Sequence, residues 1–282
     1  MQKDYFKGRI LVLATKHEKE KVMTQILEKE LGVKVIVPSD FDTDRFGTFS
    51  GEIKRAGDQL EAARHKALAG MEHCNIDLGV SSEGSFGSHP SYPFVSSNLE
   101  LVLLVDRKNN IEIRGHYRSQ ETNNSGQYVT TIQEAKVFAK NCGFPEHGII
   151  LKNSKSGDKL YKGIRTFEEL EKCFYILQEN LSQKIFIEAD LRAHMNPTRM
   201  KNIQLATHDL VKNAKNICIK CGCPGFAIVA IEKGLPCSCC GFPTDLVTFS
   251  IYGCQKCNHK QSFPRADGLK NADPGQCNYC NP

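Results

Sequence analysis

Short apolar runs alternate with amphipathic stretches along the first part of the chain. The runs at residues 9–15, 33–38 and 76–80 have the length of buried strands. The apolar positions of residues 22–31 recur at helical spacing, and the Ala-rich residues 53–69 also predict a helix. Alternation of strands and helices predicts a sheet with helices packed against it.

The residues after the second predicted helix indicate a loop and a hairpin. Gly70 would end that helix, and the Gly- and Ser-rich residues 81–88 read as a loop that follows the third strand. Two apolar runs, at residues 99–106 and 111–117, are separated by four polar residues. This spacing predicts a β-hairpin and therefore a mixed sheet.

A second stretch continues the α/β pattern up to a change in composition at Asn216. Strands are predicted at residues 148–152 and 184–189, and helices at residues 131–141, 166–179 and 197–215. Asn196 before Pro197 has the pattern of an N-cap with Pro at the first helical position. We therefore expect an α/β domain at residues 1–215, with a mixed central sheet and flanking helices, and a small second domain at residues 216–282.

The overall composition is that of an ordinary globular protein. Hydrophobic residues make up 40% of the 282 residues, and no apolar run approaches the roughly 20 residues that span a bilayer. We therefore expect a cytoplasmic protein without a membrane partner. The net charge of +5 permits an anionic ligand but does not require one.

Cysteine content changes this picture, because ten of the 13 cysteines lie in residues 218–282. Eight of them form four Cys-x-x-Cys pairs, and two such pairs supply the four sulfurs of a tetrahedral zinc site. The sequence predicts about two structural zinc ions in the second domain, and it leaves open whether adjacent or alternate pairs share a metal. The expected ligands are Cys218, Cys221, Cys237, Cys240, Cys254, Cys257, Cys277 and Cys280.

The predicted zinc sites are structural rather than catalytic, because four thiolates leave no open coordination position. Cys223 and Cys239 are surplus to the four pairs. A zinc deaminase is excluded, because no His is followed two residues later by Glu. The module could instead present a surface to nucleic acid or to a protein partner.

Two polar segments of the first domain carry candidate chemistry. The first is GTFSGE at residues 47–52, and the second is DLGVSSEGSFG at residues 77–87. Open α/β sheets bind ligands where a strand runs out into a loop, and backbone N–H groups of a Gly-rich loop can face phosphate oxygens. A carboxylate beside phosphates normally holds Mg²⁺. The standard P-loop, dinucleotide-binding and nucleophile-elbow motifs are absent.

These segments resemble the inosine/xanthosine triphosphate pyrophosphatase superfamily, which hydrolyses non-standard nucleoside triphosphates to monophosphates. The resemblance rests on ATKHEK at residues 14–19, on Glu52 and Arg55 ahead of EAAR at residues 61–64, and on Asp77 with Glu83. The whole chain also resembles an uncharacterised bacterial family with a Cys-rich tail, through ATKHEKE, FGTFSGE, SSEGSFGSHP, RAHMNPTRM, LPCSCCGFPT and CNYCNP.

The superfamily resemblance implies a nucleoside triphosphate pyrophosphohydrolase that uses Mg²⁺ or Mn²⁺. Glu52 and Glu83 would hold the metal, and Asp77 would be a further ligand or base. His17 and Glu20 depart from the superfamily pattern. A non-catalytic protein that binds nucleotide, RNA or protein is therefore the alternative. The expected triphosphate contacts are Thr15, Lys16, Lys19, Arg55, Ser81, Ser82, Gly84 and Ser85.

Overall fold

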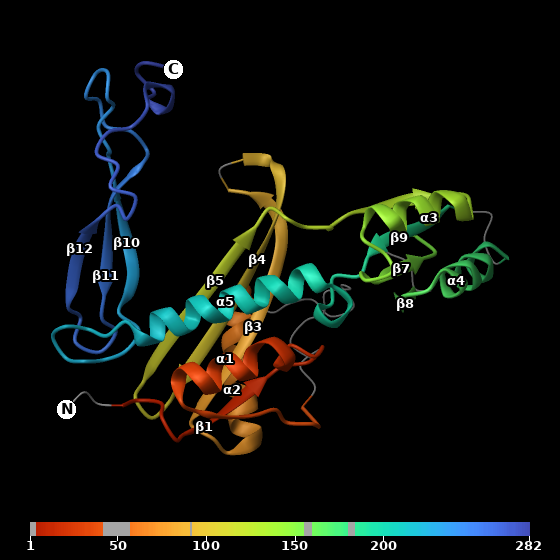
Figure 1. Cartoon of the computed structure of the whole chain (residues 1–282), viewed down its shortest axis with the longest axis horizontal. Helices are drawn as coiled ribbons and strands as arrows, with labels where there is room; N and C mark the ends of the chain where they lie inside the picture. Colours follow the sequence, from red (N-terminus) through yellow and green to blue (C-terminus); the bar gives the residue numbers. More distant parts are fainter. Residues whose placement is uncertain (1–3, 42–56, 91, 155–159, 180–183) are drawn as a thin grey trace. The chain divides into compact units, whose positions relative to one another are not determined.

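A computed structural model of the chain describes residues 4–41, 57–90, 92–154, 160–179 and 184–282 (Figure 1). Contacts within the chain divide it into two units. We call Phe6–Lys108 together with Arg114–Val211 the α/β unit. The remainder, which consists of Met1–Tyr5, Asn109–Ile113 and Lys212–Pro282, is the cysteine unit.

The first sheet is mixed, as the sequence predicts, and has the strand order β2-β1-β3-β4-β5. Strand β1 runs parallel to both of its neighbours, β2 and β3, whereas β3 and β4 are antiparallel. The strands are β1 (Ile10–Ala14), β2 (Lys34–Ile36), β3 (Leu78–His89), β4 (Tyr92–Asp106) and β5 (Ile111–Ser119). The carboxyl end of β1, where the chain turns away, is an edge that can accept a ligand.

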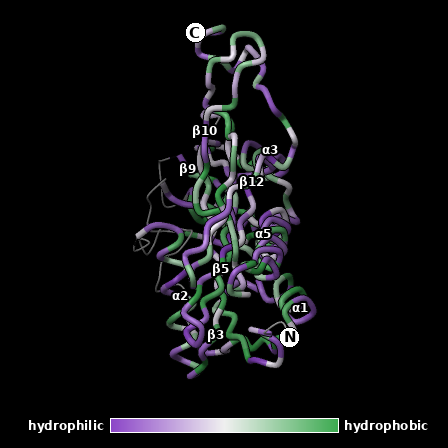
Figure 2. Tube along the Cα trace, turned by 90° about the vertical axis from the view of Figure 1, so that its left-hand side faces the viewer, coloured by the Kyte–Doolittle hydropathy of each residue, from purple (hydrophilic) through white to green (hydrophobic). Residues whose placement is uncertain are grey.

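Helices cover both faces of this sheet. Figure 2 shows α2 (Gln59–Cys74) on one side of the strands, and α1 (Glu20–Leu31) with α5 (Pro197–Lys215) on the other. Asn196 caps α5 as predicted, because its Oδ1 accepts a hydrogen bond from the Arg199 backbone N–H at 3.0 Å. No helix among the described residues is long and apolar enough to cross a membrane.

Strand β3 and helix α2 each correct an expectation from the sequence. Residues 81–88 are not a loop but the continuation of β3, which pairs with β4 from Leu78 to His89. Ser and Gly are weak strand formers, yet the apolar β4 beside them fixes the pairing. Similarly, α2 does not end at Gly70 but continues to Cys74, and a Cβ at Gly70 would lie 2.8 Å from the Ala14 Cβ. Gly70 therefore permits close packing of helix on strand.

A second sheet follows, separate from the first, where the sequence suggested one central sheet. Its order is β6-β9-β7-β8 and every pairing is antiparallel. Strands at 148–152 and 184–189 were predicted, but their short partners β6 and β8 were not. The elements are β6 (Gly126–Val129), α3 (Ile132–Asn141), β7 (Ile149–Lys152), β8 (Leu160–Ile164), α4 (Phe167–Glu179) and β9 (Ile185–Ala189).

The cysteine unit contains a three-stranded antiparallel sheet with the order β10-β11-β12. Its strands are β10 (Ala227–Lys233), β11 (Val247–Gly253) and β12 (Lys260–Pro264). Most side chains of β10 are exposed, including Ile228, Val229 and Ile231. A sheet this open buries little apolar surface, so its stability needs another source.

Candidate functional site

Eight cysteines of the cysteine unit form two groups of four sulfurs, each of which could hold a metal ion. In one group the Sγ atoms of Cys221 and Cys254 lie 3.5 Å apart, and in the other those of Cys240 and Cys277 lie 3.7 Å apart. Four thiolates at about 2.3 Å from a tetrahedral zinc ion would be separated by about 3.8 Å. The spacing therefore fits zinc. The groups are Cys218, Cys221, Cys254 and Cys257, and Cys237, Cys240, Cys277 and Cys280.

Alternate rather than adjacent Cys-x-x-Cys pairs share a group. The first pair along the chain joins the third, and the second joins the fourth. The two groups are therefore interleaved in sequence, and each ties together segments that lie more than 30 residues apart. Cys223 and Cys239 lie outside both groups.

Backbone amides favour the metal-binding form of one of these cysteines, Cys237. The backbone N–H of Cys240, followed by that of Cys239, lowers the pKa of Cys237 to about 7. A hydrogen bond to sulfur favours the thiolate, which is the form that binds zinc. The tight turn between Cys237 and Cys240 thus brings two sulfurs together and favours the charged state of Cys237.

In the α/β unit, charged side chains gather around the middle of β3, beside the carboxyl end of β1. Lys19 comes from the segment between β1 and α1, and its Nζ donates to the backbone oxygen and Oγ of Ser82 at 3.1 and 2.9 Å. Lys19 is only 7% exposed. Burial, followed by the charge of Arg199, lowers the pKa of Lys19 to about 7.

Glu83 is the next residue on β3 and is 3% exposed. Its carboxylate forms an ion pair with Lys66, which lies on the buried face of α2. Gln59, at the start of the same helix, donates to the Glu83 backbone oxygen at 2.7 Å and accepts from the Ser85 Oγ at 3.2 Å. This half of the cluster therefore lies between β3 and α2.

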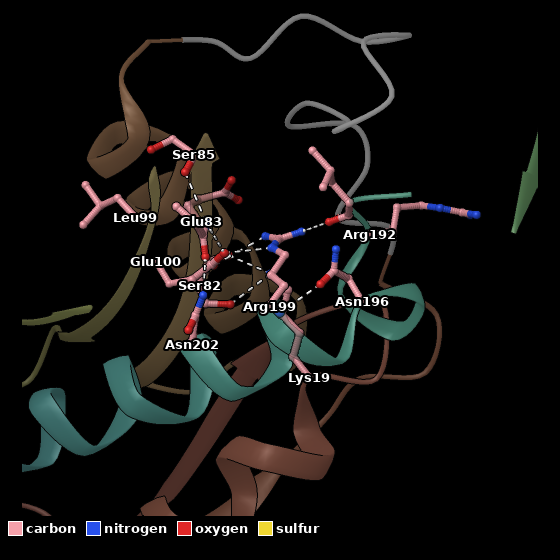
Figure 3. A network of polar contacts seen from close by, with 12 residues as sticks. Lys19, Ser82, Glu83, Ser85, Leu99, Glu100, Arg192, Asn196, Arg199 and Asn202 are labelled. Carbon is pink, nitrogen blue, oxygen red and sulfur yellow. Dashed lines mark hydrogen bonds and ion pairs between the residues drawn. The ribbon is translucent and has the colours of Figure 1, made fainter. Parts of the chain in front are cut away.

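Glu100 of β4 and Arg199 of α5 form a second buried ion pair, with Arg199 Nε 2.8 Å from Glu100 Oε1 (Figure 3). Arg199 Nη1 also donates to the Leu191 backbone oxygen at 2.6 Å. The chain of contacts continues from Glu100 through Asn98 to Asn202, at 3.0 and 2.9 Å. This half of the cluster lies between the sheet and α5.

Gly84 lies directly beneath the Glu100–Arg199 pair. A Cβ at this position would come within 2.4 Å of Glu100 Oε1 and 2.7 Å of Arg199 Nη2. The sequence assigned Gly84 to phosphate contact, but in the structure the space above it is filled by an ion pair. The absent side chain therefore makes room for Glu100 and Arg199.

The two halves of the cluster lie on opposite faces of β3, because successive residues of a strand point to opposite sides. Ser82 and Gly84 face Lys19 and Arg199, whereas Glu83 faces Lys66 on α2. The two halves of the cluster approach each other at the carboxyl end of β1. Beyond Ser81, β3 no longer has β1 beside it to separate them. The charges there act on one another, since the positive charge of Lys66 and the negative charge of Glu83 both influence the pKa of Lys19.

Several residues expected at this site have other roles or positions. Asp77 precedes β3, forms an ion pair with Arg9 at 2.9 Å and lies six residues from Glu83, about 20 Å along a strand. Ser81 donates to the Ala63 backbone oxygen at 2.6 Å and so faces α2. Glu52 and Arg55 lie outside the described residues.

Thr15 and Lys16 lie in the segment that joins β1 to Lys19. Thr15 is buried and donates to the Lys16 backbone oxygen at 3.1 Å, while the Lys16 side chain is exposed. His17 and Glu18 have φ angles of 69° and 60°, which are unfavourable for residues with a side chain. The ring of His17 stacks on His194 at 4.7 Å between centroids. Strain of this kind is common where a segment serves binding.

The sequence did not reveal Lys66, Glu100 or Asn202 as residues of this cluster, and Arg199 was not among the expected site residues. A signal existed for two of them. Lys66 interrupts an alanine face at helical spacing, and Glu100 interrupts the apolar run of β4. A charge within a buried pattern indicates a buried partner, but the partner of Glu100 lies 99 residues away and cannot be read from the sequence.

The described elements define a mixed α/β protein with several sheets and two cysteine groups that could hold metal ions. The chain belongs to the DUF6671 family, a domain of unknown function, whose family model matches residues 66–282. The matched residues include Glu83, Glu100, Arg199 and the eight cysteines of both groups. The family match bears out the expected family with a Cys-rich tail. No curated protein matches the chain.

Proposed function

We propose that the chain is a metal-dependent hydrolase of nucleoside triphosphates, among them non-standard ones, that releases pyrophosphate. The α/β unit would have a pyrophosphatase-like fold, and its site would lie around Lys19, Lys66 and Glu83 at the carboxyl end of β1. One observation carries the proposal: five charged side chains, including Glu100 and Arg199, are each at most 9% exposed in a single cluster.

Burial of this much charge is difficult to explain by stability alone. Each ion loses several kcal/mol of hydration, and well-packed apolar residues commonly do as well or better. The lowered pKa of Lys19 leads to the same conclusion, because it shows that burial disfavours the charged form of this side chain. Strongly perturbed pKa values concentrate at functional sites.

The side chains of the cluster suggest separate roles. Lys19 and Lys66 would bind phosphate oxygens, and an incoming phosphate would give Lys66 a second anionic partner. That exchange would release the carboxylate of Glu83 for Mg²⁺ or Mn²⁺, which binds oxygen ligands and usually takes one or two carboxylates together with substrate phosphates. The metal would polarise the phosphoryl group and offset its developing charge.

Arg199 would position the site rather than touch the substrate. Its guanidinium already donates to Glu100 and to the Leu191 backbone oxygen. By holding Glu100 over Gly84, Arg199 would fix the section of β3 that carries Ser82 and Glu83. A site built on rigid strands keeps its geometry better than one built on a loop.

The two cysteine groups would hold structural zinc ions, and the cysteine unit would present a surface to nucleic acid or to a protein partner. Reduced thiols in such number fit a cytoplasmic setting. Closed sites with four thiolates leave no coordination position for a substrate. The hydrolysis would therefore belong to the α/β unit.

A non-catalytic nucleotide binder is the second candidate, and one observation favours it. Glu83 is already paired with Lys66, and Glu100 with Arg199. Both carboxylates are therefore neutralised without a metal. If the pair of Glu83 and Lys66 does not open, nucleotide could bind through cations alone and would not be hydrolysed.

The test is release of pyrophosphate from a panel of nucleoside triphosphates with Mg²⁺ or Mn²⁺. We expect turnover by the full chain, and a loss on the order of a hundredfold or more in Glu83→Gln. The matched control is Glu72→Gln, an exposed carboxylate on α2, which should keep full activity. If the chain binds nucleotide but shows no turnover, the hydrolase proposal is wrong and the non-catalytic nucleotide binder takes its place.

A further inference from the structure

Strands β3 and β4 continue beyond the rest of the sheet as a two-stranded arm. Strand β1 pairs with β3 only as far as Ser81, but β3 and β4 remain paired out to His89 and Tyr92. Figure 1 shows this arm projecting past the end of β1. We use the term arm for residues 85–90 and 92–98.

Aromatic side chains are exposed on the arm without an apolar core beneath them. Phe94 is fully exposed and Tyr92 is 59% exposed. The ring of His89 stacks on Tyr92, with centroids 5.2 Å apart. An exposed ring stack of this kind is a platform on which a further planar ring can lie.

A polar cavity of about 440 Å³ lies at the base of the arm. Three basic side chains line it, His89 from β3, Arg118 from β5 and Lys201 from α5, against one acidic side chain, Glu121. Arg118 is held in place through Ser97, whose Oγ accepts from its Nη1 at 3.0 Å. That bond uses one of five guanidinium donors.

Uncharged hydrogen-bonding groups complete the cavity. Tyr117, Gln120 and Asn202 line it, and Asn202 is held by its hydrogen bond to Asn98. The lining is therefore polar and has an excess of positive charge. Interfaces between proteins have the opposite character at their centre, where charged residues are depleted.

We propose that the arm and the cavity bind single-stranded nucleic acid. The cavity would take a backbone phosphate between Arg118 and Lys201, and unstacked bases would lie on the rings of Tyr92 and Phe94. Proteins that bind single strands combine these two elements, a basic groove and exposed aromatic rings. A duplex keeps its bases stacked and offers no free face to the rings. This surface is distinct from the proposed hydrolase site around Lys19, Lys66 and Glu83.

The experiment is fluorescence anisotropy of labelled 12-nucleotide oligo(U) and oligo(dT) without divalent metal, so that hydrolysis does not interfere. We expect binding by the full chain that weakens with salt. Arg118→Ala/Lys201→Ala should weaken it at least tenfold and lower the salt slope by about 0.7, the value for loss of one phosphate contact to a single strand. Phe94→Ala should weaken it on the order of tenfold with the salt slope unchanged.

The matched control is Lys29→Ala/Lys172→Ala, which removes the same charge from exposed sites on α1 and α4. It should stay within twofold of the unmodified chain. The proposal is overturned if the control loses as much affinity, if a duplex of equal length binds as tightly, or if no strand binds at low salt. It is also overturned if Phe94→Ala keeps full affinity but separates a dimer on size-exclusion chromatography, because the arm would then join two copies.

Discussion

The two units of the chain are organised in opposite ways. The α/β unit buries Lys19, Glu83 and Arg199 beside a well-packed apolar core, whereas the cysteine unit leaves Ile228 and Val229 exposed on its sheet. The first has enough apolar burial to tolerate buried charge, and we expect the second to depend on metal ions held by its two cysteine groups. Removal of metal should therefore unfold the cysteine unit, whereas substitution of a buried charged residue tests the α/β unit.

Metal removal should have the largest effect. A structural zinc ion contributes about 10–16 kcal/mol to the folding of small modules, so a strong chelator should unfold β10, β11 and β12. The α/β unit should keep its structure. Amide hydrogen exchange read by mass spectrometry separates the two units. Protected amides in all three strands after complete metal loss would refute this account of the cysteine unit.

The alternate grouping of cysteines makes a separate prediction about stoichiometry. Cys218 and Cys254 belong to one group, so Cys218→Ser/Cys254→Ser should lose one of two ions. Cys218→Ser/Cys237→Ser should lose both. Adjacent grouping predicts the reverse for each variant. Native mass spectrometry counts the ions, and Cys223→Ser is the control that should retain two.

In the α/β unit, the largest expected change comes from the pair of Glu100 and Arg199. Glu100→Gln leaves a buried guanidinium without its counter-charge, which should lower the free energy of unfolding by about 3–5 kcal/mol. The exposed pair of Glu18 and Lys21 is the comparison, and Glu18→Gln should cost less than about 1 kcal/mol. Urea unfolding measures both, and equal losses would show that burial of the first pair has no energetic consequence.

A smaller effect is expected at the glycines of β3. Gly84→Ala forces a methyl group against Glu100 and Arg199 and should cost about 1–3 kcal/mol. Gly87 lies on the same strand, where an added Cβ would meet nothing within 4 Å. Gly87→Ala should therefore change stability by less than about 0.5 kcal/mol. Thermal melting distinguishes the two variants. An unchanged melting temperature in Gly84→Ala would mean that Glu100 and Arg199 do not pack closely against the strand at this position.

Burial of Lys19 also predicts a dependence of stability on pH. The pKa of Lys19 falls from 10.5 to about 7 on folding, so the unfolded chain binds more protons between these values. The free energy of unfolding should therefore rise with pH across this window, by at most about 1.4 kcal/mol per pH unit for one proton. Below pH 7 both states are protonated and the contribution is constant.

This dependence can be isolated by substitution. Lys19→Met should remove the extra rise between pH 7 and pH 9, whereas Lys29→Met, at an exposed position of α1, should retain it. Urea unfolding at the two pH values gives the comparison. An identical pH dependence in the unmodified chain and in Lys19→Met would show that Lys19 has an ordinary pKa.

Features carried by neighbouring residues were predictable from the sequence. The four Cys-x-x-Cys pairs, the helix at residues 197–215 and its cap at Asn196 each depend on residues within one or two turns of chain. The grouping of the pairs could not be predicted, because it depends on how segments more than 30 residues apart are brought together.

Strand β3 illustrates the other limit. Its Ser and Gly residues have the composition of a loop, and only pairing with β4 makes them a strand. The sequence assigned Ser82 to phosphate contact and Glu83 to metal binding in a loop, whereas the structure places both on a strand beside buried charged side chains. Placed on a strand, the two side chains point to opposite faces, where Ser82 meets Lys19 and Glu83 meets Lys66 of α2.

The central claim is that the cluster around Lys19 binds the phosphates of a nucleotide. The most direct measurement is calorimetric binding of a non-hydrolysable nucleoside triphosphate with Mg²⁺ at pH 8, in two buffers of different ionisation enthalpy. Lys19, with a pKa of about 7, is then mostly neutral, and a bound phosphate restores its charge. We predict uptake of close to one proton by the full chain and none by Lys19→Met. Absence of binding, or the same proton uptake in both proteins, would contradict the claim.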